Sequence, residues 1–239
     1  YSIKKSDMIT CDAEAVKEKI ITDYSYDPKK IIVFPWGIDL KLFNPHNKTV
    51  PTELSDWKTN DVVVCSRQHK PIYGIEYLLE AIPKVVEKFK NARFLFVGSG
   101  PLTPVFENTA KELGITDKVR FIGAVANETL PYYLNNSAVY VTPSLSDGSS
   151  LSLMEALACA LPVVATDIEA NQEWITNEVG VLCNTKDATD LARAIISLLK
   201  ADFGRQAFEE SALKIAMEKA DWDKNFQKLE KIYHKLQTR

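Results

Sequence analysis

Short apolar runs alternate along the chain with longer segments in which apolar residues recur every three or four positions. Six of these runs predict strands: Val62–Ser66, Arg93–Val97, Val119–Ile122, Val139–Thr142, Val163–Ala165 and Val179–Leu182. The segments between them predict helices, the clearest being Ile75–Phe89, Glu128–Leu134 and Ala188–Leu199. Strands that alternate with helices are typical of crossover units. We therefore expect an α/β fold with a Rossmann-like parallel sheet and helices on both faces.

Two regions lie outside this alternation. Near the amino end, Met8–Thr10 and Ile31–Phe34 predict strands, and Asp12 is a candidate cap for a helix that ends near Asp23. Near the carboxyl end, Asp221 is a candidate cap for a helix with an apolar stripe formed by Trp222, Phe226, Leu229, Tyr233 and Leu236. Such a stripe needs an apolar partner surface.

Composition narrows the function classes. A hydrophobic fraction of 46% over 239 residues can build a substantial core. A net charge of −3 argues against a nucleic-acid binder. The cysteines and histidines are few and scattered, so we expect no disulfide framework, no metal site and no cofactor. A reducing cytoplasm is the simplest location for such a chain.

An acidic loop carries the candidate chemistry. Asp147, Gly148, Ser149 and Ser150 follow a predicted strand and precede a helix that contains Glu155. Such a loop lies at the carboxyl edge of a parallel sheet, where open α/β proteins bind ligands. A helix N-terminus there offers unpaired N–H groups to a phosphate. The pattern favours a phosphorylated ligand that is rich in hydroxyl groups.

Several motifs, taken together in order and spacing, resemble the C-terminal half of the retaining glycosyltransferases of family 4, which have the two-domain GT-B fold. The matching pieces cover most of the chain: Ser6–Thr10, Pro35–Asp39, Ser66–Arg67 with Gly74, Val97–Pro101, Phe121–Val125, Pro143–Thr166 and Asn171–Ile175.

The resemblance implies a division of the chain. Residues 1–45 would be the trailing strand and helix of an N-terminal acceptor domain plus a crossover, and residues 46–239 the nucleotide-sugar donor domain with its C-terminal helices. The full-length parent would be a retaining hexosyltransferase, with a UDP-sugar as the favoured donor and an unknown acceptor. This chain alone would bind donor and transfer nothing. Peripheral membrane association would concern the full-length enzyme only.

The resemblance also implies roles for the two acids of the loop and helix. Glu155 would hold the donor ribose, although Ser152 and Glu155 also have capping-box spacing. Asp147 stands where the family usually has Glu and would meet the sugar's hydroxyls, although an Asp-Gly turn is the alternative explanation. Backbone N–H groups of Gly148 and Ser149, and of Ser150 and Leu151 after them, would face the sugar and the β-phosphate.

Just past the first strand of the main alternation, Arg67 matches the arginine that binds the diphosphate. The family adds a lysine immediately before the glycine that matches Gly74, and this chain has Tyr73 there. Lys70 is the nearest cation, and His69 is a weaker candidate. The second phosphate contact would therefore come from Lys70 or Tyr73.

Three further positions complete the implied donor site. Gly98 would act as a turn with its backbone near the ligand. Val125 matches a position whose backbone contacts the base, and Gly123, shortly before it, is a further donor-binding candidate. Two other functions stay open: a non-transferring GT-B relative such as a nucleotide-sugar 2-epimerase, and a nucleotide-sugar-binding module without activity.

Overall fold

The computed structural model describes residues 3–57, 59–200 and 205–237. Its main sheet contains six parallel strands: β3 (Val62–Cys65), β4 (Arg93–Val97), β5 (Val119–Gly123), β6 (Val139–Thr142), β7 (Val163–Thr166) and β8 (Gly180–Cys183). Every predicted strand is present within one residue at each end. The central strands are buried on both faces, which is why their sequences are continuous apolar runs.

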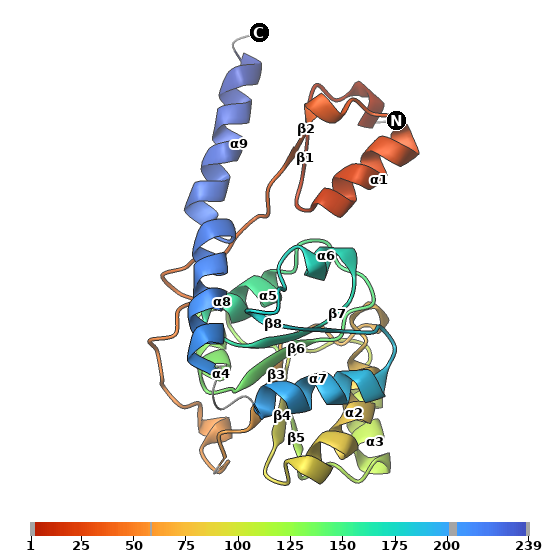
Figure 1. Ribbon diagram of the computed structural model, residues 1–239, viewed down its shortest axis with the longest axis vertical. Helices are drawn as coiled ribbons and strands as arrows, with labels where there is room; N and C mark the ends of the chain where they lie inside the picture. The colour runs from red at the N-terminus through yellow and green to blue at the C-terminus, as the bar shows by residue number, and fades with distance from the viewer. Residues whose placement is uncertain (1–2, 58, 201–204, 238–239) are drawn as a thin grey trace.

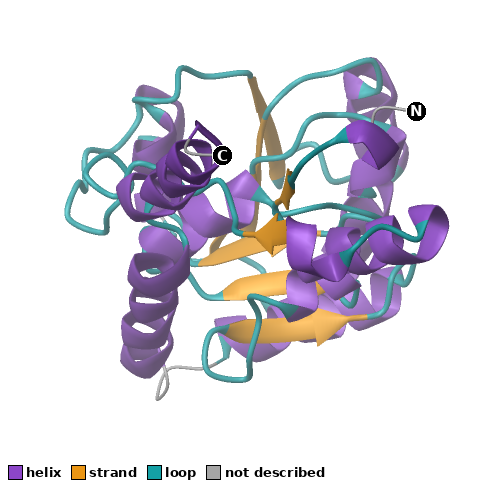
Figure 2. Cartoon of the chain, turned by 90° about the horizontal axis from the view of Figure 1, so that it is seen from above, coloured by secondary structure: helices purple, strands orange, loops and turns teal. Residues whose placement is uncertain are grey.

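Helices cover both faces of the sheet (Figures 1 and 2). One face packs on α2 (Ile75–Lys88), α3 (Thr103–Glu112) and α7 (Ala188–Leu199), and the other on α4 (Leu130–Asn135), α5 (Leu151–Ala158) and α8 (Arg205–Lys219). A short helix, α6 (Glu169–Gln172), follows β7. Successive side chains of β3 point to opposite faces of the sheet. Val63 packs into the core on the side of α2, α3 and α7, and Val64 packs into the core on the side of α4, α5 and α8. The α/β fold expected from the sequence is confirmed.

The strand order β5-β4-β3-β6-β7-β8 reverses direction between β3 and β6. These two strands pair in register at Val63 with Val139 and at Val64 with Tyr140. The chain leaves β3 toward one edge and leaves β6 toward the other, so their following loops diverge and open a crevice. In doubly wound sheets, ligands bind at this switch point, beyond the carboxyl ends of the strands.

The amino-terminal residues form a small parallel pair, β1 (Ile9–Cys11) and β2 (Ile31–Val33), with α1 (Glu14–Tyr24) between them. The strands are confirmed within one residue, but the prediction that Asp12 caps α1 is wrong. Ala13 is the N-cap residue and no side chain caps this helix. The Asp12 carboxylate instead accepts a hydrogen bond from the Ser149 backbone N–H, at 3.2 Å.

The carboxyl-terminal helix α9 (Trp222–Gln237) begins as predicted, with the Asp221 carboxylate accepting from the Lys224 N–H at 3.2 Å. Its predicted apolar stripe is largely uncovered: Trp222, Phe226 and Tyr233 are exposed, and the buried residues of α9 are Asn225 and Ile232. Within the described part of the chain, no helix is long and apolar enough to cross a membrane.

Gly74 joins the two sides of the switch point. It has a φ of +59°, and a Cβ there would lie 2.3 Å from the Pro143 carbonyl oxygen. Gly114 has a similar φ of +66°, but a Cβ there would meet nothing within 4 Å. Comparing the two glycines separates the cost of a left-handed backbone from the cost of close packing.

We predict that Gly114→Ala costs about 1–2 kcal/mol of unfolding free energy, the usual penalty for a left-handed L-residue. Gly74→Ala should cost a further ~1–3 kcal/mol, because the methyl group overpacks against fixed backbone. Urea denaturation of both variants measures the difference. Equal losses would show that Pro143 moves aside without resistance.

Candidate donor-binding site

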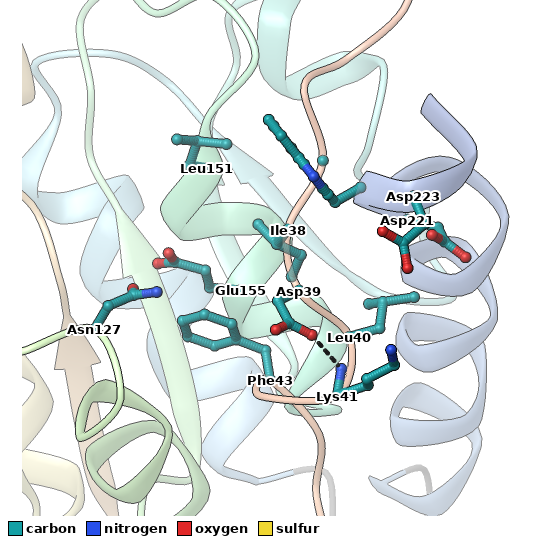
Figure 3. Close-up of a pocket in the computed structure, with 12 residues that line it drawn as sticks. Ile38, Asp39, Leu40, Lys41, Phe43, Asn127, Leu151, Glu155, Asp221 and Asp223 are labelled. Atoms are coloured by element: carbon teal, nitrogen blue, oxygen red, sulfur yellow. Dashed lines mark hydrogen bonds between the residues drawn. The ribbon is translucent and has the colours of Figure 1, made fainter. Parts of the chain in front are cut away.

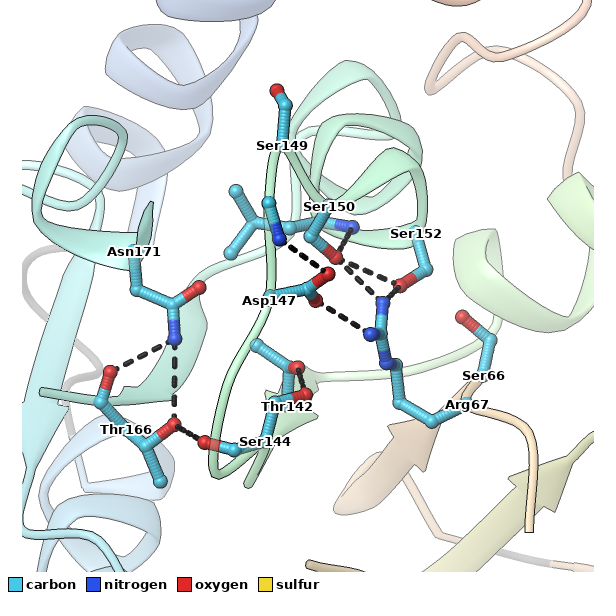
Figure 4. Close-up of polar contacts among 12 residues, drawn as sticks. Ser66, Arg67, Thr142, Ser144, Asp147, Ser149, Ser150, Ser152, Thr166 and Asn171 are labelled. Carbon is cyan, nitrogen blue, oxygen red and sulfur yellow. Dashed lines mark hydrogen bonds and ion pairs between the residues drawn. The ribbon is translucent and has the colours of Figure 1, made fainter. Parts of the chain in front are cut away.

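Two loops form the candidate site at the carboxyl ends of β3 and β6. They are joined directly, because the Leu145 N–H donates to the Ile72 carbonyl at 2.8 Å. The second loop is also fixed to β7 through the Thr166 hydroxyl, which donates to the buried Ser144 carbonyl at 2.5 Å (Figure 4). The loops and the start of the following helix border an open cavity of about 340 Å³, lined by Ser66, Arg67, Gln68, Tyr73, Asp147, Ser149, Ser150, Leu151, Ser152 and Glu155.

Arg67 is the centre of this site and is only 7% exposed. Its Nη1 donates to the hydroxyls of Ser150 and Ser152, both at 2.7 Å, and its Nη2 lies 2.5 Å from the Asp147 carboxylate (Figure 4). The guanidinium lies over the Tyr73 ring, 4.1 Å from its centroid, in a cation–π contact. A permanent positive charge is thus held rigidly at the wall of the cavity.

Two polar atoms at this wall are buried and make no hydrogen bond within the described structure: Arg67 Nε and Ser149 Oγ. An unpartnered buried polar group costs roughly 1–3 kcal/mol. Such groups are therefore rare in stable proteins unless a ligand or water pairs with them. Both atoms can donate a hydrogen bond, and both belong to residues that line the cavity. The arrangement suits an anionic ligand with many acceptor oxygens.

The helix α5 begins at the cavity with Ser150 as its N-cap, accepting from the Leu153 N–H at 3.4 Å. The alternative in which Ser152 and Glu155 form a capping box is therefore wrong. The helix begins earlier than that pattern requires, and the Ser152 hydroxyl binds Arg67 instead. Glu155 is thus free of a capping role.

Glu155 lies one turn into α5 and lines two cavities. The second, of about 540 Å³, is also lined by Leu151, and its far wall is formed by the Gly37–Lys41 segment and the start of α9 (Figure 3). Burial raises the pKa of the Glu155 carboxyl from 4.5 to about 7, while the charge of Arg67 opposes the shift. A carboxylate with a raised pKa gains most from ligand groups that donate hydrogen bonds to it.

The acidic loop is held by two carboxylates. Asp147 pairs with Arg67, and its other oxygen accepts from the Gly148 N–H at 3.0 Å. Asp12 approaches from the end of β1, and its oxygen would lie only 3.0 Å from a Cβ at position 148. Glycine at this position therefore permits the contact.

Some predicted site residues lie outside the cavity walls. Lys70 is exposed, and His69 is fully buried with its Nδ1 2.7 Å from the Thr103 hydroxyl. Burial lowers the pKa of His69, which disfavours the cationic form of this ring. Tyr73, by contrast, lines the cavity.

The three backbone positions Gly98, Gly123 and Val125 are not among the residues that line either cavity. Gly98 lies behind Arg67: its φ is +145°, and a Cβ there would lie 2.4 Å from the Arg67 carbonyl oxygen. Its N–H donates to the Gly123 carbonyl at 2.8 Å. Gly98 thus supports the loop that carries Arg67.

Sequence reasoning missed four residues at this site: Asp12, Ser66, Gln68 and Ser152. Ser66 and Gln68 flank Arg67, so their position in the wall follows from the loop itself. In the sequence, Ser152 is identified only as a candidate N-cap of the helix that contains Glu155. Asn127 in the second cavity belongs to the loop after β5, where base contacts were expected.

The chain belongs to the family of glycosyl transferases group 1, whose model matches residues 59–201. Among curated relatives it is 27% identical over 218 residues to an uncharacterized glycosyltransferase of Methanocaldococcus jannaschii, covering 88% of this chain and 55% of that protein. It is 28% identical over 179 residues to the phosphatidyl-myo-inositol mannosyltransferase of Mycobacterium leprae, covering 74% of this chain and 47% of that protein. The chain thus spans about half the length of these relatives.

Solved structures show the same fold. The Anabaena protein HepE, in complex with UDP and glucose, matches with a TM-score of 0.85 at 18% identity, over 98% of this chain and 64% of that one. Sucrose-phosphate synthase from Thermosynechococcus elongatus matches with a TM-score of 0.84 at 23% identity, over 99% and 60% of the two chains. The chain therefore has the architecture of a GT-B glycosyltransferase domain.

We predict that Glu155→Gln stabilises the protein by about 1–3 kcal/mol near pH 8, because it removes a charge that burial disfavours. Since the folded-state pKa is above the unfolded one, the folded wild type binds more protons between about pH 4.5 and 7 and loses stability as the pH rises through this range. The difference between variant and wild type should vanish near pH 4. Urea denaturation at both pH values measures it.

The exposed Glu128 supplies the matched control. Glu128→Gln removes the same charge from the surface and should change the stability equally little at both pH values. A Glu155→Gln variant that is less stable than wild type near pH 8 would contradict the prediction and show that the carboxylate has an internal partner.

Proposed function

We propose that this chain is the donor-binding part of a retaining hexosyltransferase of family 4 and binds a nucleoside diphosphate sugar, with a UDP-sugar favoured. The observation that carries the proposal is the pair of buried, unpartnered donors, Arg67 Nε and Ser149 Oγ, at the switch point of the sheet. Residues 46–239 would form the donor domain. Residues 1–45 would be the end of an acceptor domain plus the crossover.

In this proposal the diphosphate lies against Arg67 and the backbone N–H groups from Ser149 to Leu151, which lead into the start of α5. Transfer leaves negative charge on the departing nucleoside diphosphate. A fixed guanidinium and oriented N–H groups stabilise that charge without reorganising, which lowers the barrier. Glu155 accepts from the ribose hydroxyls, and Asp147 accepts from hydroxyls of the sugar near the reacting carbon. Tyr73 or Lys70 provides the second phosphate contact.

One comparison supports a UDP-sugar as the donor, and a second supports a hexose as the transferred sugar. The HepE structures hold UDP, UDP and glucose, or UDP-glucose. The Mycobacterium leprae relative is named a mannosyltransferase, and mannose is a hexose. The matched family and these relatives are glycosyltransferases, which does not favour the epimerase alternative. The cytoplasmic location, the peripheral membrane association of the full-length enzyme and the inactivity of this chain alone stay predictions.

The test is calorimetric titration of UDP and UDP-glucose into the purified chain and its variants. We expect Arg67→Ala to lose measurable binding, Lys70→Ala to lose less and Tyr73→Phe least, because hydrogen bonds to charged groups contribute about 1.5–3 kcal/mol and neutral ones about half of that. Glu155→Gln should weaken binding of both ligands.

The matched control is Arg120→Ala. Arg120 also pairs with an aspartate, Asp56, and also lies over an aromatic ring, that of Trp57, but it is not among the residues that line the candidate cavity. This variant should bind UDP as wild type does. Unchanged UDP binding by a folded Arg67→Ala variant would overturn the proposed phosphate site.

A further inference from the structure

The groups proposed to bind the diphosphate are already engaged by carboxylates of the chain itself. Asp147 lies 2.5 Å from Arg67 Nη2, and both side chains are largely buried, with 17% and 8% exposure. Asp12 accepts from the Ser149 N–H at 3.2 Å. Asp147 therefore occupies the cation of the site, and Asp12 occupies a backbone donor of the loop that leads into α5.

The Asp12 contact depends on the residues around it. Asp12 lies between β1 and α1, and it does not cap the helix that follows it. Its oxygen comes within 3.0 Å of where a Cβ at position 148 would stand, so a larger residue there would require the carboxylate to shift by a few tenths of an ångström. Asp12 and Ser149, 137 positions apart in the sequence, are thus brought into direct contact by the fold.

Carboxylates and phosphates compete for the same partners, because both are anions that accept charge-assisted hydrogen bonds. A diphosphate that approaches Arg67 and the Ser149 N–H meets two negative charges at short range, and it can use Arg67 Nη2 and the Ser149 N–H only where a carboxylate has left. A site whose competent form is only a fraction of the population binds more weakly by that fraction.

We infer that Asp147 and Asp12 act as internal substitutes for the two phosphates of the donor and must be displaced when a nucleoside diphosphate binds. The inference rests on the proposed function of the site. It assigns Asp12, from the amino-terminal segment, as a positioning residue of the donor loop. Its release couples occupation of the donor site to β1 and α1, and release of Asp147 frees that carboxylate to reach the sugar.

The test titrates UDP, inorganic pyrophosphate and uridine into wild type, Asp147→Asn and Asp12→Asn, with folding checked by thermal unfolding. Each substitution keeps the size of the side chain and removes its charge. We expect both variants to bind UDP and pyrophosphate about three- to tenfold more tightly than wild type, with uridine binding unchanged. Glu18→Gln, which removes an exposed charge from α1, should bind all three as wild type does.

The sugar separates the roles of the two aspartates. In Asp147→Asn, the affinity for UDP-glucose should increase less than the affinity for UDP, because this variant also loses the contact to the sugar. In Asp12→Asn, the affinity for both ligands should increase equally. Unchanged or weaker UDP binding in both variants, with wild type still binding UDP, would overturn the inference and leave the proposed function standing. An equal increase in affinity for uridine would also overturn it, because the carboxylates would then hinder every ligand of the cavity and not the phosphates in particular. Failure of wild type and every variant to bind UDP or pyrophosphate would overturn both.

Discussion

The buried guanidinium of Arg67 is the interaction on which the rest of the site depends. A charge that is only 7% exposed is tolerated because three side chains from the neighbouring loop and helix, those of Asp147, Ser150 and Ser152, accept from it. Removing one partner of such a buried cluster would leave an uncompensated charge, which is strongly destabilising. The same cluster therefore ties β3 to α5, fixes the N-terminus of that helix and holds a positive charge at the cavity.

Close backbone approach makes this geometry possible. Gly98 lets β4 lie against the Arg67 carbonyl, and Gly74 lets the start of α2 lie against Pro143, so the loops after β3 and β6 cannot drift apart. The buried hydroxyls of Thr142 and Thr166, both paired with Ser144, anchor the acidic loop from beneath. A catalytic or binding group gains from such support because its orientation is set before any ligand arrives.

Much of the fold could be predicted from the sequence, because parallel strands that are buried on both faces appear as uninterrupted apolar runs. The helix α8 could not, since its buried face consists of alanines such as Ala212 and Ala216, which produce little contrast with their neighbours. At the site, Arg67, Tyr73 and Glu155 could be predicted because they stand at positions of the motifs that carry the family resemblance, and all three line the cavity. Asp12 could not be found in this way: its local pattern resembles a helix cap, and only the folded chain brings it to Ser149.

The site's charges are balanced within a narrow space, and this balance decides what each acid can do. Arg67 opposes the effect of burial on Glu155 but does not cancel it, so the pKa of that carboxyl stays near 7. Asp147 takes up much of the guanidinium's charge through a direct contact, which leaves less of that charge to act on Glu155, one turn into α5. If an anionic ligand displaces Asp147 from Arg67, the field at both acids changes at once. Binding at the phosphates and hydrogen bonding to the ribose and sugar would then be coupled through Arg67, and the coupling would require no movement larger than that of the acidic loop.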